Sequence, residues 1–248
     1  MNYTALQKLT PEMMDMLEEA SYYRYKDTRK EYEKSFHTVP RVTRILETCM
    51  DSTYLTKWAN SLGLKGKVYE DVLNMYADFG SKTHQEVEDY IQHGIIPNKK
   101  SNSFMAFEKW WSIITKQHQW KILGMEEKLV SPWFGGTYDM LIEIDGNRFL
   151  VDFKTSGRIS FRYCLQLAAY HILMEYNNLP DIDGFLILRL PRNNPNFEEC
   201  VYHYNNYEHK KFLDHCERTF IHMVYTYWYL NVGEAEFIRL QKGEDNEK

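Results

Sequence analysis

Apolar and polar positions follow a helical period in the first half of the chain. From Val68 to His93, apolar side chains recur every three or four residues, which predicts one long amphipathic helix that Gly94 and Pro97 end. The same period returns between Phe104 and Trp120, and we interpret the aromatic residues there as core rather than as a platform for nucleic-acid bases. Upstream, the residues from Pro40 onward predict a short helix, a loop and another helix.

Beyond residue 120 the period shortens to that of β-strands. Strands are predicted over Lys121–Val130, Gly136–Ile144 and Arg148–Lys154. The dipeptide Asp145-Gly146 separates the second strand from the third, and it is a strong signal for a tight hairpin turn. The second and third strands should therefore lie side by side and antiparallel.

The remaining chain alternates between helix and strand. A helix is predicted over Ser160–Tyr176, and Asp183–Leu190 is an almost continuous apolar run, as in strands covered on both faces. A strand over Glu198–Tyr204 leads to a closing helix over Glu208–Leu230, whose aromatic end (MVYTYWYL) fits a core element, a lid or a dimer surface. This order predicts an α/β fold with a mixed central sheet flanked by helices.

The sequence predicts one domain with two flanking segments. Residues 1–39 form a predicted helical extension, residues 40–240 the domain, and residues 241–248 a polar tail. No stretch of altered composition marks a linker within the domain.

Composition narrows the class of protein. Aromatic residues are 15% of the chain, which excludes wholesale disorder. The formal net charge is −5, so a site for a polyanion would have to be a local patch. No apolar run is long enough for a membrane span and no targeting signal is visible, so we expect an intracellular protein without membrane partners. The four cysteines are scattered without a CxxC pair, which argues against a zinc ribbon or a disulfide framework.

Candidate chemistry concentrates in residues 136–156, GTYDMLIEIDGNRFLVDFKTS. Asp152 and Lys154 are two residues apart on a predicted strand, so their side chains share a face, and the hairpin brings Asp139 close to them. Two carboxylates suit a hard divalent cation, and a lysine can hold a water or stabilise charge developing on a phosphate. Taken alone, however, D-x-K is more often an ordinary surface pair.

Other residues are informative only together with this segment. Gln166 and Tyr170 share one face of the predicted helix that follows the third strand. His84 lies beside the apolar stripe of the Val68–His93 helix, where a lone histidine is more often structural than a ligand. Either Glu126 or Glu127, in the first predicted strand, can add a carboxylate.

Taken in order, these motifs resemble those of the RecB-like branch of the PD-(D/E)XK nuclease superfamily. They read GSKTHQEVE, MEEKLV, GGTYD, VDFKTS and LQLAAY, and the preceding VPRVTRIL and LTKWAN are similar to the phage and mitochondrial genome maintenance exonucleases. The resemblance covers about Pro40 to Tyr170. Tyr138 stands where the superfamily name has proline, a position that varies in this branch.

The resemblance implies a restriction-endonuclease-like core and a set of metal ligands. Asp139 and Asp152 would bind Mg²⁺ or Mn²⁺, with the Phe153 carbonyl as a further oxygen and His84 near the metal. The resemblance also implies a glutamate ligand in the first strand, and either Glu127 or its neighbour Glu126 could match that position.

The same resemblance implies the catalytic groups. Asp139 and Asp152 would act with Lys154 as the catalytic lysine, and Gln166 and Tyr170 would orient this lysine or touch the phosphate backbone. Gly136 would allow close backbone packing before Asp139.

The activity implied is metal-dependent hydrolysis of DNA phosphodiester bonds. An exonuclease acting on single-stranded ends or flaps in replication, recombination or repair is favoured, with an endonuclease or a catalytically silent DNA- or partner-binding module as alternatives. A helicase or recombination protein would be a separate chain, because no GxxxxGK[ST] motif is present. No iron–sulfur cluster is expected, since only Cys200 and Cys216 lie near the C-terminus. Candidate phosphate contacts are Lys99, Lys100, Arg158 and Arg162.

Overall fold

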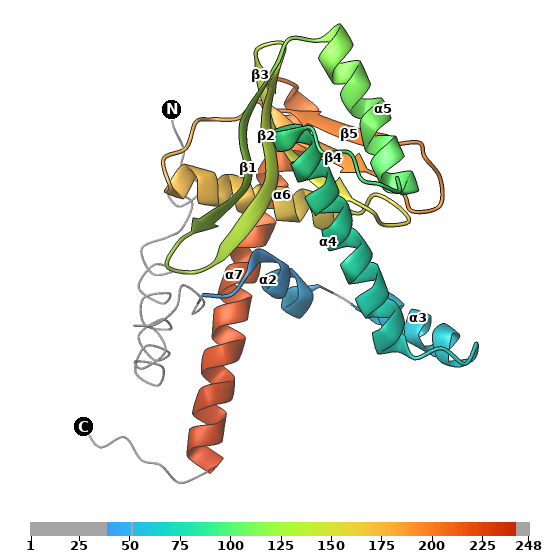
Figure 1. Ribbon diagram of the computed structural model, residues 1–248. Helices are drawn as coiled ribbons and strands as arrows, with labels where there is room; N and C mark the ends of the chain where they lie inside the picture. The colour runs from blue at the N-terminus through green and yellow to red at the C-terminus, as the bar shows by residue number, and fades with distance from the viewer. Residues whose placement is uncertain (1–38, 51, 242–248) are drawn as a thin grey trace.

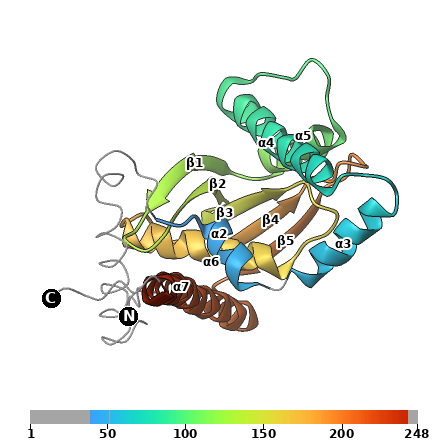
Figure 2. The ribbon, with the colours of Figure 1, turned by 90° about the horizontal axis from the view of Figure 1, so that it is seen from below.

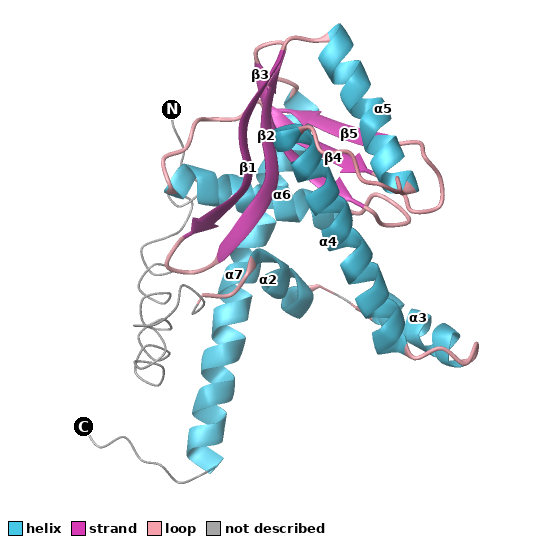
Figure 3. Ribbon diagram, in the orientation of Figure 1, coloured by secondary structure: helices cyan, strands magenta, loops and turns pink. Residues whose placement is uncertain are grey.

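The computed structural model describes residues 39–50 and 52–241 (Figure 1). The predicted N-terminal extension and polar tail therefore lie almost entirely outside the described residues. In the described part, a five-stranded mixed sheet is flanked by helices, which confirms the predicted α/β class and is consistent with a restriction-endonuclease-like core (Figure 3).

The strands follow one another across the sheet in chain order. They are β1 (Trp120–Val130), β2 (Gly135–Ile144), β3 (Asn147–Lys154), β4 (Gly184–Arg189) and β5 (Glu198–His203). Only β3 and β4 are parallel, and α6 provides the crossover between them. The apolar run predicted to be a doubly covered strand is β4, which is buried along almost its whole length.

The hairpin between β2 and β3 forms as predicted. Asp145 has φ 49° and Gly146 has φ 79°, so both turn residues adopt the left-handed conformation that a type I′ turn requires. This turn sets the register, in which Ile144 faces Asn147 and Met140 faces Val151. The same register places Asp139 beside the carboxyl end of β3.

The described helices are α2 (Val42–Cys49), α3 (Thr53–Gly63), α4 (Tyr69–His93), α5 (Asn102–Gln117), α6 (Phe161–Tyr176) and α7 (Tyr207–Gln241). The predicted boundary at Trp120 is wrong: the chain is extended from His118, and Trp120 begins β1 while packing against Trp111 at 4.8 Å. The closing helix continues through Gly233 beyond the predicted end at Leu230, because a glycine weakens a helix without necessarily stopping it.

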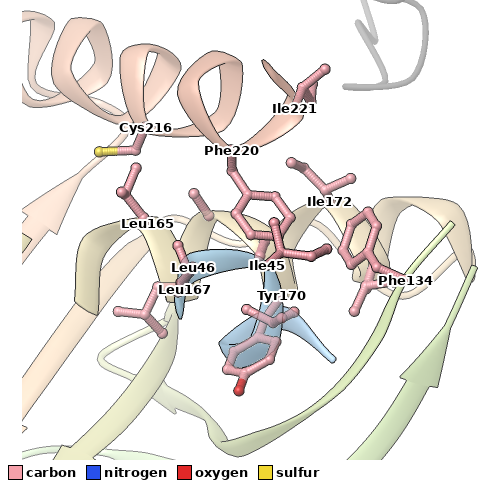
Figure 4. Close-up of a cluster of buried hydrophobic side chains, with 14 of the residues drawn as sticks. Ile45, Leu46, Phe134, Leu165, Leu167, Tyr170, Ile172, Cys216, Phe220 and Ile221 are labelled. Carbon is pink, nitrogen blue, oxygen red and sulfur yellow. The ribbon is translucent and has the colours of Figure 1, made fainter. Parts of the chain in front are cut away.

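Two apolar cores cover the two faces of the sheet. Helices α2, α6 and α7 pack on one face, and α4 and α5 lie on the other (Figure 2). Side chains alternate along β3, so that Leu150 joins the first core while Val151 and Phe153 join the second. In the first core, Phe220 of α7 points toward α2 and α6 (Figure 4).

The aromatic residues of α5 and α7 mainly build these cores. Phe107, Trp110 and Trp111 are buried, which confirms their interpretation as core. Tyr225, Tyr227 and Trp228 of α7 are buried as well, whereas Tyr229 and Leu230 are exposed, so one side of the aromatic end of this helix belongs to the core. Among the residues described, no helix combines the length and apolarity needed to cross a membrane.

Candidate active site

The predicted catalytic residues meet at the carboxyl end of β3. In the register of the two parallel strands, Lys154 faces Arg189, and each is the last residue of its strand. Helix α4 reaches this edge from one face of the sheet and α6 lies across the other (Figure 1). The site therefore lies where two helix layers approach one strand end.

Asp152 and Lys154 form a buried ion pair. Lys154 Nζ donates to Asp152 Oδ1 at 2.6 Å, and the Asp152 side chain is completely buried. Among the described residues, Asp152 Oδ2 has no hydrogen-bond partner. Burial and the nearby charge of Asp139 raise the pKa of Asp152 to about 6, although Lys154 opposes this shift. A buried carboxylate oxygen without a partner is costly, so this atom suits a ligand that would satisfy it.

Asp139 and His84 form a second charged pair around the backbone of Phe153. Asp139 Oδ2 accepts from the Phe153 N–H at 2.6 Å, and Asp139 Oδ1 lies 3.4 Å from His84 Nδ1. On its other side, His84 Nε2 donates to the Phe153 carbonyl oxygen at 3.0 Å. Three predicted ligand groups thus lie together.

The charges of this second pair stabilise each other. Burial alone would lower the pKa of His84, but the Asp139 carboxylate outweighs burial and raises it to about 10. Burial alone would raise the pKa of Asp139, whereas His84, Lys154 and the Phe153 N–H together lower it. Asp139 is therefore ionised at neutral pH.

The structure distinguishes between the two candidate glutamates of β1. Glu126 Oε1 lies 3.8 Å from His84 Nδ1, and the ligand atoms of Glu126, His84 and Asp139 all lie within 4.8 Å of one another. Glu127 instead hydrogen-bonds Tyr138 and, together with burial, raises the pKa of that phenol. Glu126 is therefore the glutamate placed beside the predicted ligands.

Glu126 also has an unusual backbone conformation. Its φ is 48°, in the left-handed region that a residue other than glycine rarely adopts inside a strand. Residues in such rare backbone conformations cluster at functional sites, where the position of a side chain matters. A bulge between Ile122 and Gly124 precedes it and shifts the register by one residue, so Glu126 comes opposite Asp139.

Helix α6 contributes the predicted glutamine and tyrosine. Gln166 Nε2 donates to Tyr170 Oη at 2.9 Å, and both side chains are buried. Burial, followed by the charges of Asp139 and Asp152, raises the pKa of Tyr170, which therefore remains neutral beside the site. The structure connects these two residues to each other and places Tyr170 within the electrostatic influence of Asp139 and Asp152.

One aromatic residue of α6 at the site was not predicted. The ring of Tyr163 lies 5.1 Å from Lys154 Nζ, in a cation–π contact. Its signal in the sequence is helical spacing: Tyr163, Gln166 and Tyr170 follow at i, i+3 and i+7 and therefore share a face.

Close packing at Gly136 supports the same arrangement. A Cβ on this residue would lie 2.6 Å from Tyr170 Cε1 and 3.1 Å from Val42 Cγ2. A side chain here would displace the tyrosine, as the predicted role of Gly136 implies.

The four candidate phosphate contacts are in different situations. Lys100 pairs with Glu108 at 2.7 Å, and Arg162 Nη2 donates to the Thr43 carbonyl at 3.3 Å. Lys99 and Arg158 are exposed.

The donor set fits a metal ion. His84, Glu126 and Asp139 can hold one, and carboxylate and carbonyl oxygens are the ligands that Mg²⁺ and Mn²⁺ prefer. The unpartnered Asp152 Oδ2 provides a further oxygen in the same neighbourhood.

Comparison with solved structures finds 18 matching chains, and two of these neighbours illustrate the level of similarity. No family model and no curated protein matches the chain. The crystal structure of SSO0001 is similar with a TM-score of 0.37 and 12% identity, over 83% of this chain and 85% of that one. A phage-related exonuclease from Haemophilus somnus 129PT has a TM-score of 0.30 and 12% identity, over 62% and 82%. Similarity at this level does not assign an activity.

Proposed function

We propose that this chain is a Mg²⁺- or Mn²⁺-dependent deoxyribonuclease that hydrolyses phosphodiester bonds. One observation carries the proposal: the fully buried Asp152 lies beside the cluster of His84, Glu126 and Asp139. One of its oxygens is hydrogen-bonded to Lys154, and the other has no partner among the residues that the structure describes. Charges are not buried in this way for stability, because desolvation offsets much of the Coulombic gain. Metal-assisted hydrolysis of a phosphate ester would use them all.

The chain's own groups divide into ligands and charge stabilisers. His84, Glu126, Asp139 and Asp152 would hold the cation, with the Phe153 carbonyl as a further oxygen. The cation, when bound, would activate water and neutralise charge on the phosphate. Each protein ligand is fixed by an element of the fold, so little reorganisation would be needed on binding.

Lys154 would orient the attacking water and stabilise negative charge. Burial alone would lower its pKa, but Asp152 and Asp139 raise it, so the side chain remains an ammonium group. An ammonium has N–H donors and no free electron pair, so it would not remove the proton. The Tyr163 ring would hold the ammonium in place from the side opposite α4.

We further propose an exonuclease that degrades single-stranded DNA ends or flaps, working with a separate helicase or recombination protein. The ordered motifs support this finer assignment. The test uses one oligonucleotide labelled at either end and the same sequence as a closed circle, each with Mg²⁺ or Mn²⁺. Stepwise shortening of the linear strand with an intact circle is expected. A cut circle would identify an endonuclease instead, and retained binding without cutting would identify a binding module.

A further inference from the structure

Three side chains from separate segments form a layered arrangement on the outer part of α4. The Arg192 guanidinium carbon is 3.5 Å from the centre of the Tyr76 ring. The Trp58 ring lies almost parallel to Tyr76, at 5.9 Å and 15°. We call Trp58, Tyr76 and Arg192 the aromatic–arginine stack. It joins α3, α4 and the loop that follows β4.

This stack lies on the same edge of the sheet as the candidate active site. Arg192 is three residues beyond Arg189, which ends β4 opposite Lys154 at the end of β3. Ligands of open α/β sheets bind outside the carboxyl ends of the strands, and both groups occupy that position. Figure 1 shows α4 running from this edge outward to α3.

Helix α4 connects the two groups along one side. Tyr76, Gly80 and His84 follow at intervals of four residues, so they lie along one side of the helix. Eight residues correspond to about 12 Å of helix length. Gly80, between them, has no side chain and faces Thr155, whose Oγ1 would lie 3.6 Å from an added Cβ. Phe79 of α4 lies next to the stack on this side, with its ring centre 5.9 Å from the Arg192 guanidinium carbon.

The guanidinium of Arg192 has no carboxylate partner among the described residues and is therefore available to an anionic ligand. In the part of the chain that the structure describes, no carboxylate lies within ion-pair distance of it, whereas Arg189 pairs with Glu198 at 2.6 Å. The Arg192 backbone carbonyl accepts from Asn102, which fixes the loop. Tyr76 remains 37% exposed. Because Arg192 covers one face of the Tyr76 ring and Trp58 lies parallel to the ring, an incoming nucleobase would stack on the outer face of the guanidinium, whose N–H groups can contact a phosphate.

We propose that the aromatic–arginine stack binds a nucleotide of a single strand whose scissile phosphodiester lies at Lys154. The inference rests on the proposed nuclease function and adds to it a binding subsite for the single strand. A base within a duplex is already stacked on both sides, whereas an unpaired base has faces free for this contact. Glu70 and Asp71, in the first turn of α4, disfavour a long phosphate track there, so stacking provides most of the contact and Arg192 its charge.

Binding without cleavage tests this proposal. A fluorescein-labelled oligothymidylate and a blunt duplex are titrated with the protein in EDTA, and anisotropy is recorded. Tyr76→Ala and Arg192→Ala should each weaken single-strand binding about tenfold, leaving duplex binding unchanged. Tyr76→Phe should bind as the native protein does. Arg192→Ala should lower the slope of log affinity against log salt by about one, and Tyr76→Ala should not change it.

Matched controls come from the opposite edge of the sheet. Arg148, at the start of β3, is half-buried, and Tyr207, which follows β5, is exposed. Because both lie away from the stack, Arg148→Ala and Tyr207→Ala should bind as the native protein does. Arg192→Lys keeps the charge but loses the planar group, and we expect an intermediate affinity. Circular dichroism confirms the folding of each variant.

The outcomes separate this inference from the proposed function. If the native protein and the Tyr76 and Arg192 variants bind the single strand with equal affinity, the proposed binding role of the stack is refuted, whether or not the protein is a nuclease. If single-strand binding depends on the stack but the protein hydrolyses no DNA with either metal, the proposed nuclease activity is refuted and the proposed binding role of the stack stands. Hydrolysis of bis(p-nitrophenyl) phosphate with Mn²⁺, a substrate without a base, should be unchanged in the stack variants.

Discussion

The two ends of the β2–β3 hairpin carry charged pairs in opposite surroundings. At the turn, Arg148 Nε lies 3.6 Å from Glu143 Oε2, with the two side chains 40% and 34% exposed. At the open end, Asp152 and Lys154 are 2.6 Å apart, and the aspartate is fully buried. An exposed pair costs little and contributes little, whereas a buried one loses much of its attraction to desolvation. The hairpin therefore buries charge only at the end where helices from both faces meet.

The largest expected difference between the two ends is in catalysis. Asp152→Asn or Lys154→Ala should lower DNA hydrolysis about 10³-fold or more, because the first removes a charged ligand and the second the ammonium that faces the phosphate. Arg148→Gln, at the turn, should leave the rate unchanged. Initial rates on a labelled single strand at saturating Mg²⁺ measure all three. If Arg148→Gln lowered the rate of hydrolysis as much as Asp152→Asn or Lys154→Ala, the two ends of the hairpin would not differ in catalysis.

The second difference is in stability. Lys154→Ala should lower the free energy of unfolding by about 3–5 kcal/mol, because it leaves Asp152 buried without its partner. Replacing the pair with Asp152→Leu and Lys154→Met should restore stability while abolishing activity. Urea unfolding in EDTA measures both.

The pH dependence of this loss has a defined sign. The folded pKa of Asp152, about 6, lies above that of an unfolded aspartate, so protonation favours the folded state. The destabilisation of Lys154→Ala should therefore be smaller at pH 5 than at pH 8. A single variant as stable as the native protein at both pH values would contradict the account.

A third contrast is between neighbouring glutamates of β1. Glu126→Gln should weaken Mn²⁺ binding about tenfold, because Glu126 Oε1 belongs to the His84–Asp139 cluster. Glu127→Gln should change it little, since that side chain contacts Tyr138. Calorimetric titration with Mn²⁺ compares the two. A larger effect at Glu127 would show that the ligand cluster is misassigned.

The smallest effect is expected at the turn. Glu143→Gln and Arg148→Gln should each change the free energy of unfolding by less than about 1 kcal/mol, as exposed ion pairs do. A double-mutant cycle measured by urea unfolding gives the interaction energy directly. A coupling as large as that of the buried pair would remove the contrast between the two ends.

The elements of the fold were predictable because local patterns determine them. The helical period of α4, the Asp145-Gly146 turn and the apolar run of β4 each need only neighbouring residues. The juxtaposition of Asp139 with Asp152 and Lys154 followed, since a two-residue turn sets the hairpin register.

Features that depend on tertiary contacts were not predictable in this way. The choice of Glu126 over Glu127 depends on the bulge between Ile122 and Gly124, which no spacing rule reveals. The contact of Tyr163 with Lys154 depends on how α6 crosses β3. Trp120 belongs to a strand because it pairs with Ile144 of β2, although its helical spacing continues that of α5.

The central claim is that the buried Asp152–Lys154 pair and the adjacent cluster constitute a metal-dependent hydrolytic site. The most direct test measures cutting of a labelled single strand by protein freed of metal with EDTA, before and after Mg²⁺ is restored in excess, for the native chain and Lys154→Ala. We predict no cutting in EDTA, full recovery with Mg²⁺ in the native chain and none in the variant. Cutting that persists in excess chelator, or a variant as active as the native chain, would contradict the account.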